Sequence, residues 1–269
     1  MDKLPIVSIV VPCFNLAKYL PETLNSVLHQ SYTQWECIIV DDGSSDDSAA
    51  IAKIYASRDD RFKLISLENG GVSRARNIGV DASQGDFILL LDADDIIMPH
   101  YIATAISAFE ADPSLTIVYG KAERFGKQNS WDLPDFSLGT MLARNCLYIS
   151  CLFKKSDFVP FDSTFKTGFE DWDFWLSILE NNENPKVLRL PDLCFRYRTR
   201  KSSRNTQVTE DVLDNIRQLL WEKHKGLYAK HFCNPRETVE YKRLESSFKK
   251  ASRWSLVWKL RLIYRKLFS

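Results

Sequence analysis

Short apolar runs alternate with segments of helical periodicity over the first 120 residues. The runs are continuous and rich in β-branched residues, as expected for strands buried on both faces of a parallel sheet. They lie at 6–11, 35–40, 62–67, 87–92 and 114–120. The segments between them predict helices at 19–30, 46–56 and 73–82, and a further one opened by Pro99. This alternation predicts βαβ units and a mostly parallel sheet flanked by helices.

The pattern is less regular in the second half of the chain, and residues 121–150 show no clear period. The later predicted elements are a helix at 169–180, strands at 186–190 and 194–198, and helices from 207 to the end. We therefore divide the chain into an α/β body at 1–206 and a C-terminal helical extension at 207–269.

Charge separates these two parts, although the whole chain has a formal net charge of only +1. Residues 207–269 contain 14 Lys/Arg and 7 Asp/Glu, a net charge of +7, so the body carries −6. Such asymmetry predicts an anionic partner for the extension. A nucleic-acid partner is not expected, because the body is acidic and the sequence carries no recognition motif.

The last 27 residues, 243–269, hold eight Lys/Arg and one Glu. At helical spacing, an apolar stripe forms from Leu256, Leu260, Ile263 and Leu267. One interpretation is an interfacial helix that binds an anionic membrane surface. The other is a helix that packs on the body with its charges in solvent.

The cysteines and the N-terminus bear on localisation. Six cysteines, at 13, 37, 146, 151, 194 and 233, form no C-x-x-C pair, which predicts buried, reduced thiols in a cytosolic protein. The first apolar run stops at Pro12, so no signal peptide is predicted, and no run approaches the roughly 20 residues of a spanning helix. The predicted location is cytoplasmic; membrane binding by 243–269 would place the protein at the inner face of the cell membrane.

Polar loops follow the first four predicted strands, at the sheet edge where open parallel sheets bind ligands. They read PCFN (12–15), DDGSSDDS (41–48), ENGG (68–71) and DADD (92–95). Taken alone, each is typical of a turn or a helix cap. Together they predict an acidic rim that binds a divalent cation, which in turn can bind the phosphates of a nucleotide.

Five motifs in order give the sequence a specific resemblance. They are VSIVVPCFN, ECIIVDDGSSDDS, ENGGVSRARNIGV, GDFILLLDADDIIMP and GFEDWDFWLSI. Over residues 5–205 the chain resembles the inverting glycosyltransferases of family 2, which have a GT-A (Rossmann-like) fold and use nucleotide-sugar donors. The resemblance implies the same fold here, a UDP-sugar as the favoured donor, and Mn²⁺ or Mg²⁺ as the metal.

The resemblance also implies roles for individual residues on the donor side. The nucleoside would be bound by Pro12, Phe14, Asn15 and Asp42. Asp94 would be the direct metal ligand, and Asp92 would reach the ribose or a metal-bound water. Arg76 either contacts the donor or pairs with an aspartate of this cluster. Asp95 is interpreted as a turn or cap residue.

On the acceptor side, the resemblance implies that Asp171 is the general base and that Glu170 orients the acceptor. Trp172 and Trp175 could stack on a sugar, but core packing is the favoured interpretation. Many relatives carry a histidine in a Y-R-x-H-x-x-S pattern, and Arg200 stands at that position here. Since arginine stays protonated, it cannot ligate a metal, and a phosphate contact is the alternative.

The predicted function is transfer of a sugar to a hydroxyl of a glycan or lipid-linked acceptor. The alternatives are a sugar nucleotidyltransferase, a phosphoacceptor signalling domain, and a non-catalytic binder of sugar nucleotides that scaffolds a membrane glycan assembly. Asp173 would face elsewhere on its helix, so neither it nor any of the four histidines is given a role.

Overall fold

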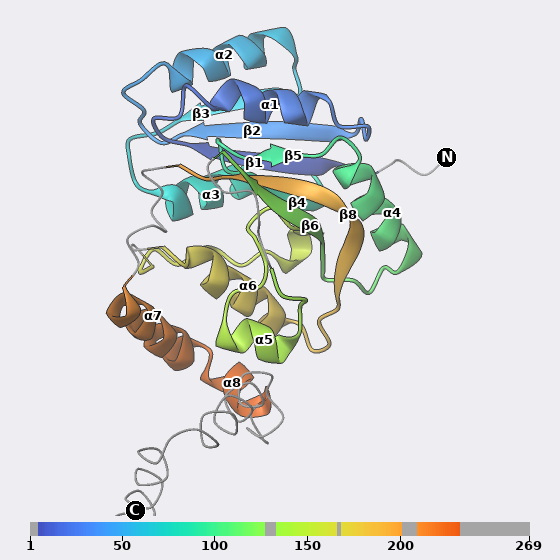
Figure 1. Ribbon diagram of the computed structural model, residues 1–269. Coiled ribbons are helices and arrows are strands. Elements are labelled where there is room, and N and C mark those ends of the chain that lie inside the picture. Colours follow the sequence, from blue (N-terminus) through green and yellow to red (C-terminus); the bar gives the residue numbers. More distant parts are fainter. Residues whose placement is uncertain (1–4, 127–132, 166–167, 201–208, 232–269) are drawn as a thin grey trace, which may run out of the picture.

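The first half of the chain folds as predicted, into parallel strands separated by helices. The computed structural model describes residues 5–126, 133–165, 168–200 and 209–231 (Figure 1). Its first elements are β1 (Val7–Cys13), α1 (Leu20–Leu28), β2 (Trp35–Asp41), α2 (Ser48–Arg58), β3 (Phe62–Ser66), α3 (Val72–Asp81) and β4 (Phe87–Leu90). All residues of β1 and β2 are buried, which explains their continuous apolar runs.

The second half extends the sheet with pairings of both directions. Its elements are β5 (Ile96–Ile97), α4 (Tyr101–Ala111), β6 (Ile117–Phe125), α5 (Leu138–Ala143), β7 (Leu152–Lys154), a 3₁₀ turn (Lys155–Asp157), α6 (Glu170–Asn181) and β8 (Val187–Arg198). Within the described residues, eight strands pair in the order β3-β2-β1-β4-β7-β6-β8-β5.

The α/β fold class is confirmed, although the sheet is mixed. Four pairs are parallel, namely β1–β2, β2–β3, β1–β4 and β6–β8, whereas β4–β7, β6–β7 and β5–β8 are antiparallel within the described part of the chain. The parallel block at β1–β4 brings the carboxyl ends of three neighbouring strands, β2, β1 and β4, to one edge of the sheet.

The prediction of two separate strands at 186–190 and 194–198 is wrong, because both belong to the continuous strand β8. Pro191 lies between the two apolar runs and cannot donate a ladder hydrogen bond. The pairing with β6 accommodates it by passing from Tyr119↔Arg189 to Lys121↔Leu193, with an irregular register. A β-bulge therefore explains how one strand carries a proline.

The predicted C-terminal helices are present in the described part, as α7 (Glu210–Lys223) and α8 (Lys225–His231). They pack on the second half of the body, where the Tyr228 hydroxyl donates to the Leu142 carbonyl at 2.9 Å. Residues 232–269, with the basic amphipathic tail, lie outside the described residues. The domain boundary at 206 stays a prediction.

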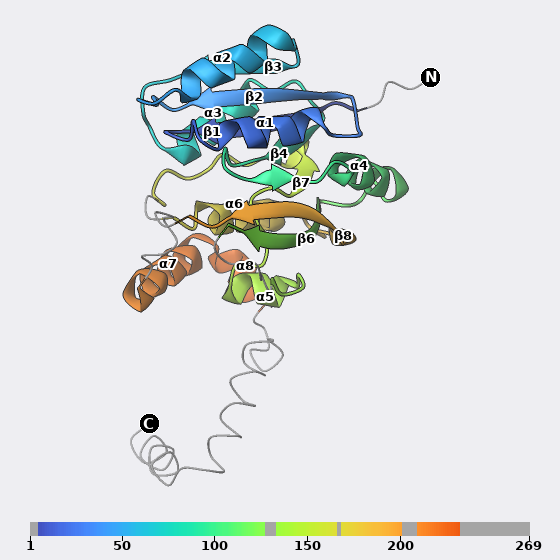
Figure 2. The same ribbon diagram turned by 45° about the horizontal axis from the view of Figure 1, so that its top comes forward.

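Helices surround the sheet at both ends of the molecule. In Figures 1 and 2, α1 and α2 lie beside β1–β3 at one end, and α5, α7 and α8 lie at the other. Among the helices of the described segments, none combines the length and apolarity that a membrane crossing requires.

Candidate active site

A pocket of about 270 Å³ opens where β1, β2 and β4 end. Five of the predicted donor-site residues line it together with Arg200: Pro12, Phe14, Asp42 and the acidic pair Asp92 and Asp94. Phe14 is 47% exposed, which is unusual for a phenylalanine and leaves its ring available to a ligand. The sheet topology thus brings together loops that are far apart in the sequence.

Asp42 is buried in the pocket wall and is held by the loop that follows β3. Its carboxylate accepts hydrogen bonds from the backbone N–H groups of Gly70 (2.9 Å) and Gly71 (2.8 Å) and from the Asn69 amide (3.2 Å). A carboxylate has about four lone-pair positions, so Asp42 can still accept from a ligand. Gly71, with φ of +91°, adopts a backbone conformation that favours glycine.

Asn15 does not line this pocket. Its side-chain oxygen accepts from the backbone N–H of Ser45 at 2.8 Å and of Asp46 at 3.3 Å. The residue therefore ties the loop after β1 to the loop after β2. Its predicted contact with the donor stays a prediction.

The acidic cluster after β4 is paired with arginines from other elements. The Arg76 guanidinium contacts Asp92 at 2.7 Å, and Arg200 contacts Asp94 at 2.7 Å. Burial, followed by the charge of Asp92, raises the pKa of Asp94 to about 6, while Arg200 opposes the rise. Asp95 is buried and accepts from the Arg198 backbone N–H at 2.8 Å, in agreement with a role in the turn.

The residues present fit a divalent cation with oxygen ligands. Asp92 and Asp94 crowd two carboxylates into one pocket wall, and the raised pKa of Asp94 reflects that crowding. Magnesium commonly takes one or two protein carboxylates and completes its shell with water and phosphate. Within the described residues, no group of three or more His, Cys, Asp or Glu side chains forms a metal cage.

A second pocket of about 400 Å³ adjoins the first and shares Asp92, Asp94 and Arg200 with it. Its walls include the predicted catalytic pair, Glu170 and Asp171, at the N-terminus of α6. Aromatic rings also line it, from Tyr148, Phe169, Phe195 and Tyr197. The acidic cluster and Arg200 therefore lie at the boundary between two spaces, with Asp171 in the second.

Asp171 has two hydrogen-bond donors in the structure. The Asn145 amide donates to Oδ2 at 3.0 Å, and the Trp172 backbone N–H donates to Oδ1 at 2.8 Å. Burial, followed by the charge of Glu170, raises the pKa of Asp171 to about 7, while Arg76 opposes the rise. A carboxyl group with this pKa exchanges protons near neutral pH, as a general base must.

Glu170 is buried and bonds to the same arginine as Asp92. Arg76 Nη1 donates to Glu170 Oε1 at 3.0 Å, and Nη2 donates to Asp92 at 2.7 Å. The guanidinium is 2% exposed, so this arginine ties α3, the end of β4 and the start of α6 together. The structure thus matches the salt-bridge alternative for Arg76, and a contact between Arg76 and the donor stays a prediction.

The chain enters α6 through an unusual turn. Gly168 and Phe169 both have positive φ, of +103° and +65°, and for a phenylalanine this conformation costs energy. Trp172 and Trp175 are fully buried, and the Trp172 indole donates to the Met141 carbonyl at 2.6 Å. Both tryptophans therefore belong to the core, as favoured from the sequence.

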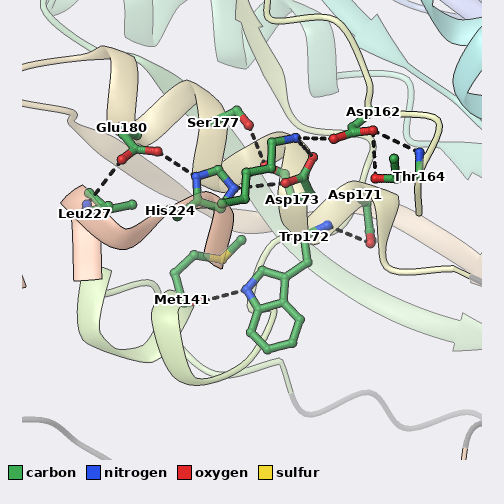
Figure 3. Close-up of polar contacts among 11 residues, drawn as sticks. Met141, Asp162, Thr164, Asp171, Trp172, Asp173, Ser177, Glu180, His224 and Leu227 are labelled. Atoms are coloured by element: carbon green, nitrogen blue, oxygen red, sulfur yellow. Dashed lines mark hydrogen bonds and ion pairs between the residues drawn. The ribbon is translucent and has the colours of Figure 1, made fainter. Parts of the chain in front are cut away.

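A polar network centred on the buried Asp173 and His224 supports α6 (Figure 3). The ring nitrogens of His224 face Asp173 Oδ1 at 2.9 Å and Glu180 Oε2 at 2.6 Å. The Lys223 ammonium group contacts Asp173 at 2.7 Å and Asp162 at 2.9 Å. The end of α7 thereby holds the helix that carries Asp171.

Neither the support of Asp171 nor that of its helix was indicated by the sequence. His224 and Asp173 are 51 residues apart, and no local spacing indicates their contact. Asn145 lies in the stretch without a clear period, so no pattern indicated that it faces Asp171. The resemblance predicted the pair Glu170 and Asp171 but not the side chains that surround it.

The sequence is similar to known glycosyltransferases. Residues 8–170 match the model of the family described as Glycosyl transferase family 2. WfgD of Escherichia coli, named a UDP-Glc:alpha-D-GlcNAc-diphosphoundecaprenol beta-1,3-glucosyltransferase, is 32% identical over 205 residues, which cover 74% of this chain and 79% of WfgD. GlyG of Streptococcus pneumoniae, named a glycosyltransferase, is 39% identical over 100 residues, which cover 37% of this chain and 33% of GlyG. The match thus spans about a third of GlyG.

A solved structure shares the fold. TarS of S. aureus in complex with UDP-GlcNAc superposes with a TM-score of 0.63 at 18% identity, over 84% of this chain and 73% of the TarS chain. At this identity the likeness concerns the fold alone. It agrees with the Rossmann-like arrangement of strands and helices described above.

Proposed function

The chain belongs to glycosyl transferase family 2, and from this premise we propose that it is a metal-dependent inverting glycosyltransferase. It transfers a sugar from a UDP-sugar to a hydroxyl group of a glycan or lipid-linked acceptor, with Asp171 as the general base. The observation that carries the proposal is the pair of adjoining pockets. The acidic pair lies at their boundary, and Asp171 stands in the second pocket.

The first pocket is proposed to hold the nucleotide. Asp42 can accept from an N–H of the base, and the exposed ring of Phe14 can pack against it. The name of WfgD and the TarS complex with UDP-GlcNAc both support a UDP-sugar as donor.

Asp92 and Asp94 would hold Mn²⁺ or Mg²⁺, with Asp94 as the direct ligand. The bound ion would supply positive charge that stabilises the leaving diphosphate. Arg200 stands where many relatives carry histidine and contacts Asp94 in this structure. Its guanidinium lines both pockets, so a contact with a donor phosphate is within its chemistry.

The second pocket is proposed to hold the acceptor and to carry out the proton transfer. The acceptor hydroxyl gives its proton to the Asp171 carboxylate as its oxygen bonds to the anomeric carbon. The bond from that carbon to the diphosphate oxygen breaks, and its electron pair leaves with UDP. Attack opposite the leaving group inverts the configuration, through a sugar that resembles an oxocarbenium ion.

The acceptor class and the membrane contact extend the proposal to the second substrate. The aromatic side chains of the second pocket suit a sugar face, and WfgD is named for a diphosphoundecaprenol-linked acceptor. Binding of residues 243–269 to an anionic membrane surface, at the inner face of the cell membrane, would bring the enzyme to such acceptors. This contact lies outside the described residues and stays a prediction.

An assay of donor turnover separates the alternatives. The purified chain is incubated with UDP-glucose or UDP-GlcNAc and Mn²⁺, with and without EDTA, and free UDP is measured alone and with polyprenyl-diphosphate-linked GlcNAc. UDP release that requires Mn²⁺ and Asp171 supports the proposal. A scaffold would bind UDP without releasing it from the sugar. A nucleotidyltransferase would instead release pyrophosphate from UTP and a sugar phosphate.

A further inference from the structure

Asn145 lies on the loop after α5 and lines the second pocket beside Asp171. Its amide NH₂ donates to Asp171 Oδ2 at 3.0 Å, and its own oxygen accepts from the Leu147 backbone N–H at 3.1 Å. The second bond fixes the orientation of the amide, so the NH₂ group and not the oxygen is directed at the carboxylate. The side chain therefore links the loop backbone directly to the proposed base.

We propose that Asn145 is a positioning residue for Asp171, which holds the carboxylate in place and favours its ionised form. The inference rests on the proposed function, because it assigns a partner to the proposed base. A donor to a carboxylate stabilises the charged state, and each oxygen keeps lone pairs that can take the acceptor proton. Asn145 is neutral, so it does this without adding a charge to the pocket.

The surroundings explain why the base needs such a partner. Glu170 on the same helix and Asp92 after β4 both disfavour a negative charge at Asp171, and the buried thiol of Cys151, before β7, also interacts with it electrostatically. Arg76 on α3 is the opposing cation, and its guanidinium already bonds Asp92 and Glu170. In the described part of the chain, the direct donors to Asp171 are the Asn145 amide and the Trp172 backbone N–H.

The loop that carries Asn145 is held rigidly enough to position a neighbour. The carbonyls at the end of α5 accept from two distant side chains, the Trp172 indole to Met141 at 2.6 Å and the Tyr228 hydroxyl to Leu142 at 2.9 Å. Cys146, which follows Asn145 directly, is buried. The amide is thus fixed by the core on one side and by its Leu147 contact on the other.

The test compares Asn145→Ala and Asn145→Asp with wild type, by the rate of UDP release from UDP-glucose or UDP-GlcNAc between pH 5.5 and 9. Loss of one hydrogen bond to a charged group should move the acid limb of the profile up by about one pH unit, with about a fivefold loss of rate at pH 7. Asn145→Asp keeps the shape but places a carboxylate beside Asp171, so its limb should move further. UDP affinity, measured by calorimetry, should stay within about twofold of wild type, because the residue lies outside the first pocket.

Asn182→Ala is the matched control. Asn182 donates to the Ile178 carbonyl at 2.9 Å at the opposite end of α6 and does not line either pocket. Its limb should coincide with that of wild type. The inference is overturned if the acid limb of the pH profile does not move in either Asn145 variant, or if UDP affinity and rate fall equally. The proposed function still stands in that case if Asp171→Asn is inactive. If Asp171→Asn releases UDP as fast as wild type, the proposed base itself fails.

Discussion

The two pockets of the site are built by different means. Around the first pocket, sheet topology places the loops, and the backbone N–H groups of Gly70 and Gly71 hold Asp42. Around the second pocket, side chains from other elements hold α6, the helix that carries the proposed base. Asn145 bonds Asp171 directly, and His224 and Lys223 bond Asp173 two residues further on.

Along α6, the residue proposed for catalysis and the residue that anchors the helix are therefore different. Asp171 faces the pocket and Asp173 faces the core, although both lie in the first turn of α6. A substitution at the first should impair transfer and leave the fold intact. Loss of the partners of the second should impair the fold. The donor side should respond mainly through ligand affinity.

The largest effect is expected from Asp171→Asn. The amide cannot take the acceptor proton, and general base catalysis contributes about 10²–10⁴-fold, so the rate of UDP release should fall by that factor. Thermal stability and UDP affinity should match wild type, because the contacts of this side chain within the described residues are hydrogen bonds and not ion pairs. Equal losses of UDP affinity and of rate would place Asp171 on the donor side and erase the distinction between the pockets.

The second prediction concerns the support behind α6. His224→Ala removes one of the two partners of the buried Asp173, which keeps its contact with Lys223, and also removes a hydrogen bond to the more exposed Glu180. Loss of a hydrogen bond to a charged group costs about 1.5–3 kcal/mol of unfolding free energy, so the midpoint of thermal unfolding should fall by roughly 3–12 °C. The control is His29→Ala, since His29 is exposed and its Nδ1 bonds the Asn25 carbonyl of its own helix. A His224→Ala midpoint equal to that of the control would mean that α7 does not stabilise the base helix.

The third prediction returns to the donor side. Asp94→Ala should lose the part of UDP binding that depends on metal, whereas Asp81→Ala, at the exposed end of α3, should not. A ligand at 100 times its dissociation constant adds about 2.7 kcal/mol to stability, which a thermal-shift measurement detects. We expect UDP to raise the unfolding midpoint of wild type in Mn²⁺ but not in EDTA. In Asp94→Ala, the shift of the midpoint should be small and equal under both conditions. An undiminished metal response in Asp94→Ala would require another ligand.

These contrasts also explain how far the sequence could be interpreted. The continuous apolar runs and the four polar loops predicted the parallel block and its acidic edge, because strand burial and strand ends are local properties. The resemblance carried Asp171 and Glu170, and the structure places both in one pocket with Asp92.

What stayed hidden depends on contacts between distant positions. The Arg76 bridge joins residues 94 positions apart, and His224 meets Asp173 across 51. The union of two predicted strands into β8 depends on a bulge opposite β6 that accommodates Pro191. None of these follows from periodicity, since each is decided by which elements the fold brings together.

The fourth prediction is the pH dependence of transfer. The pKa of Asp171 is raised by burial and by Glu170 to about 7, and the base acts only when ionised. Activity should therefore be lost as the pH falls through this value, with UDP release at pH 6 about tenfold slower than at pH 8. UDP binding should be measured in parallel, because Asp94, with a pKa raised to about 6, is itself partly protonated at pH 6, which would weaken metal binding there. A rate that is flat between pH 6 and 8 would contradict the assignment of Asp171 as base.

The smallest effect is expected at the boundary between the pockets, from Arg200→Ala. Its guanidinium contacts Asp94 and lines both pockets, so its removal should weaken UDP binding by a few-fold, about 0.5–1 kcal/mol for a partly exposed pair. Arg200→His, the residue that many relatives carry, should restore part of the affinity. Arg196→Ala is the control, because Arg196 pairs with Glu123 on the neighbouring strand and lies outside both pockets. If Arg200→Ala instead tightens the metal-dependent binding of UDP, the contact of Arg200 with Asp94 competes with the cation. Arg200 would then stabilise the ligand-free site and not the donor complex.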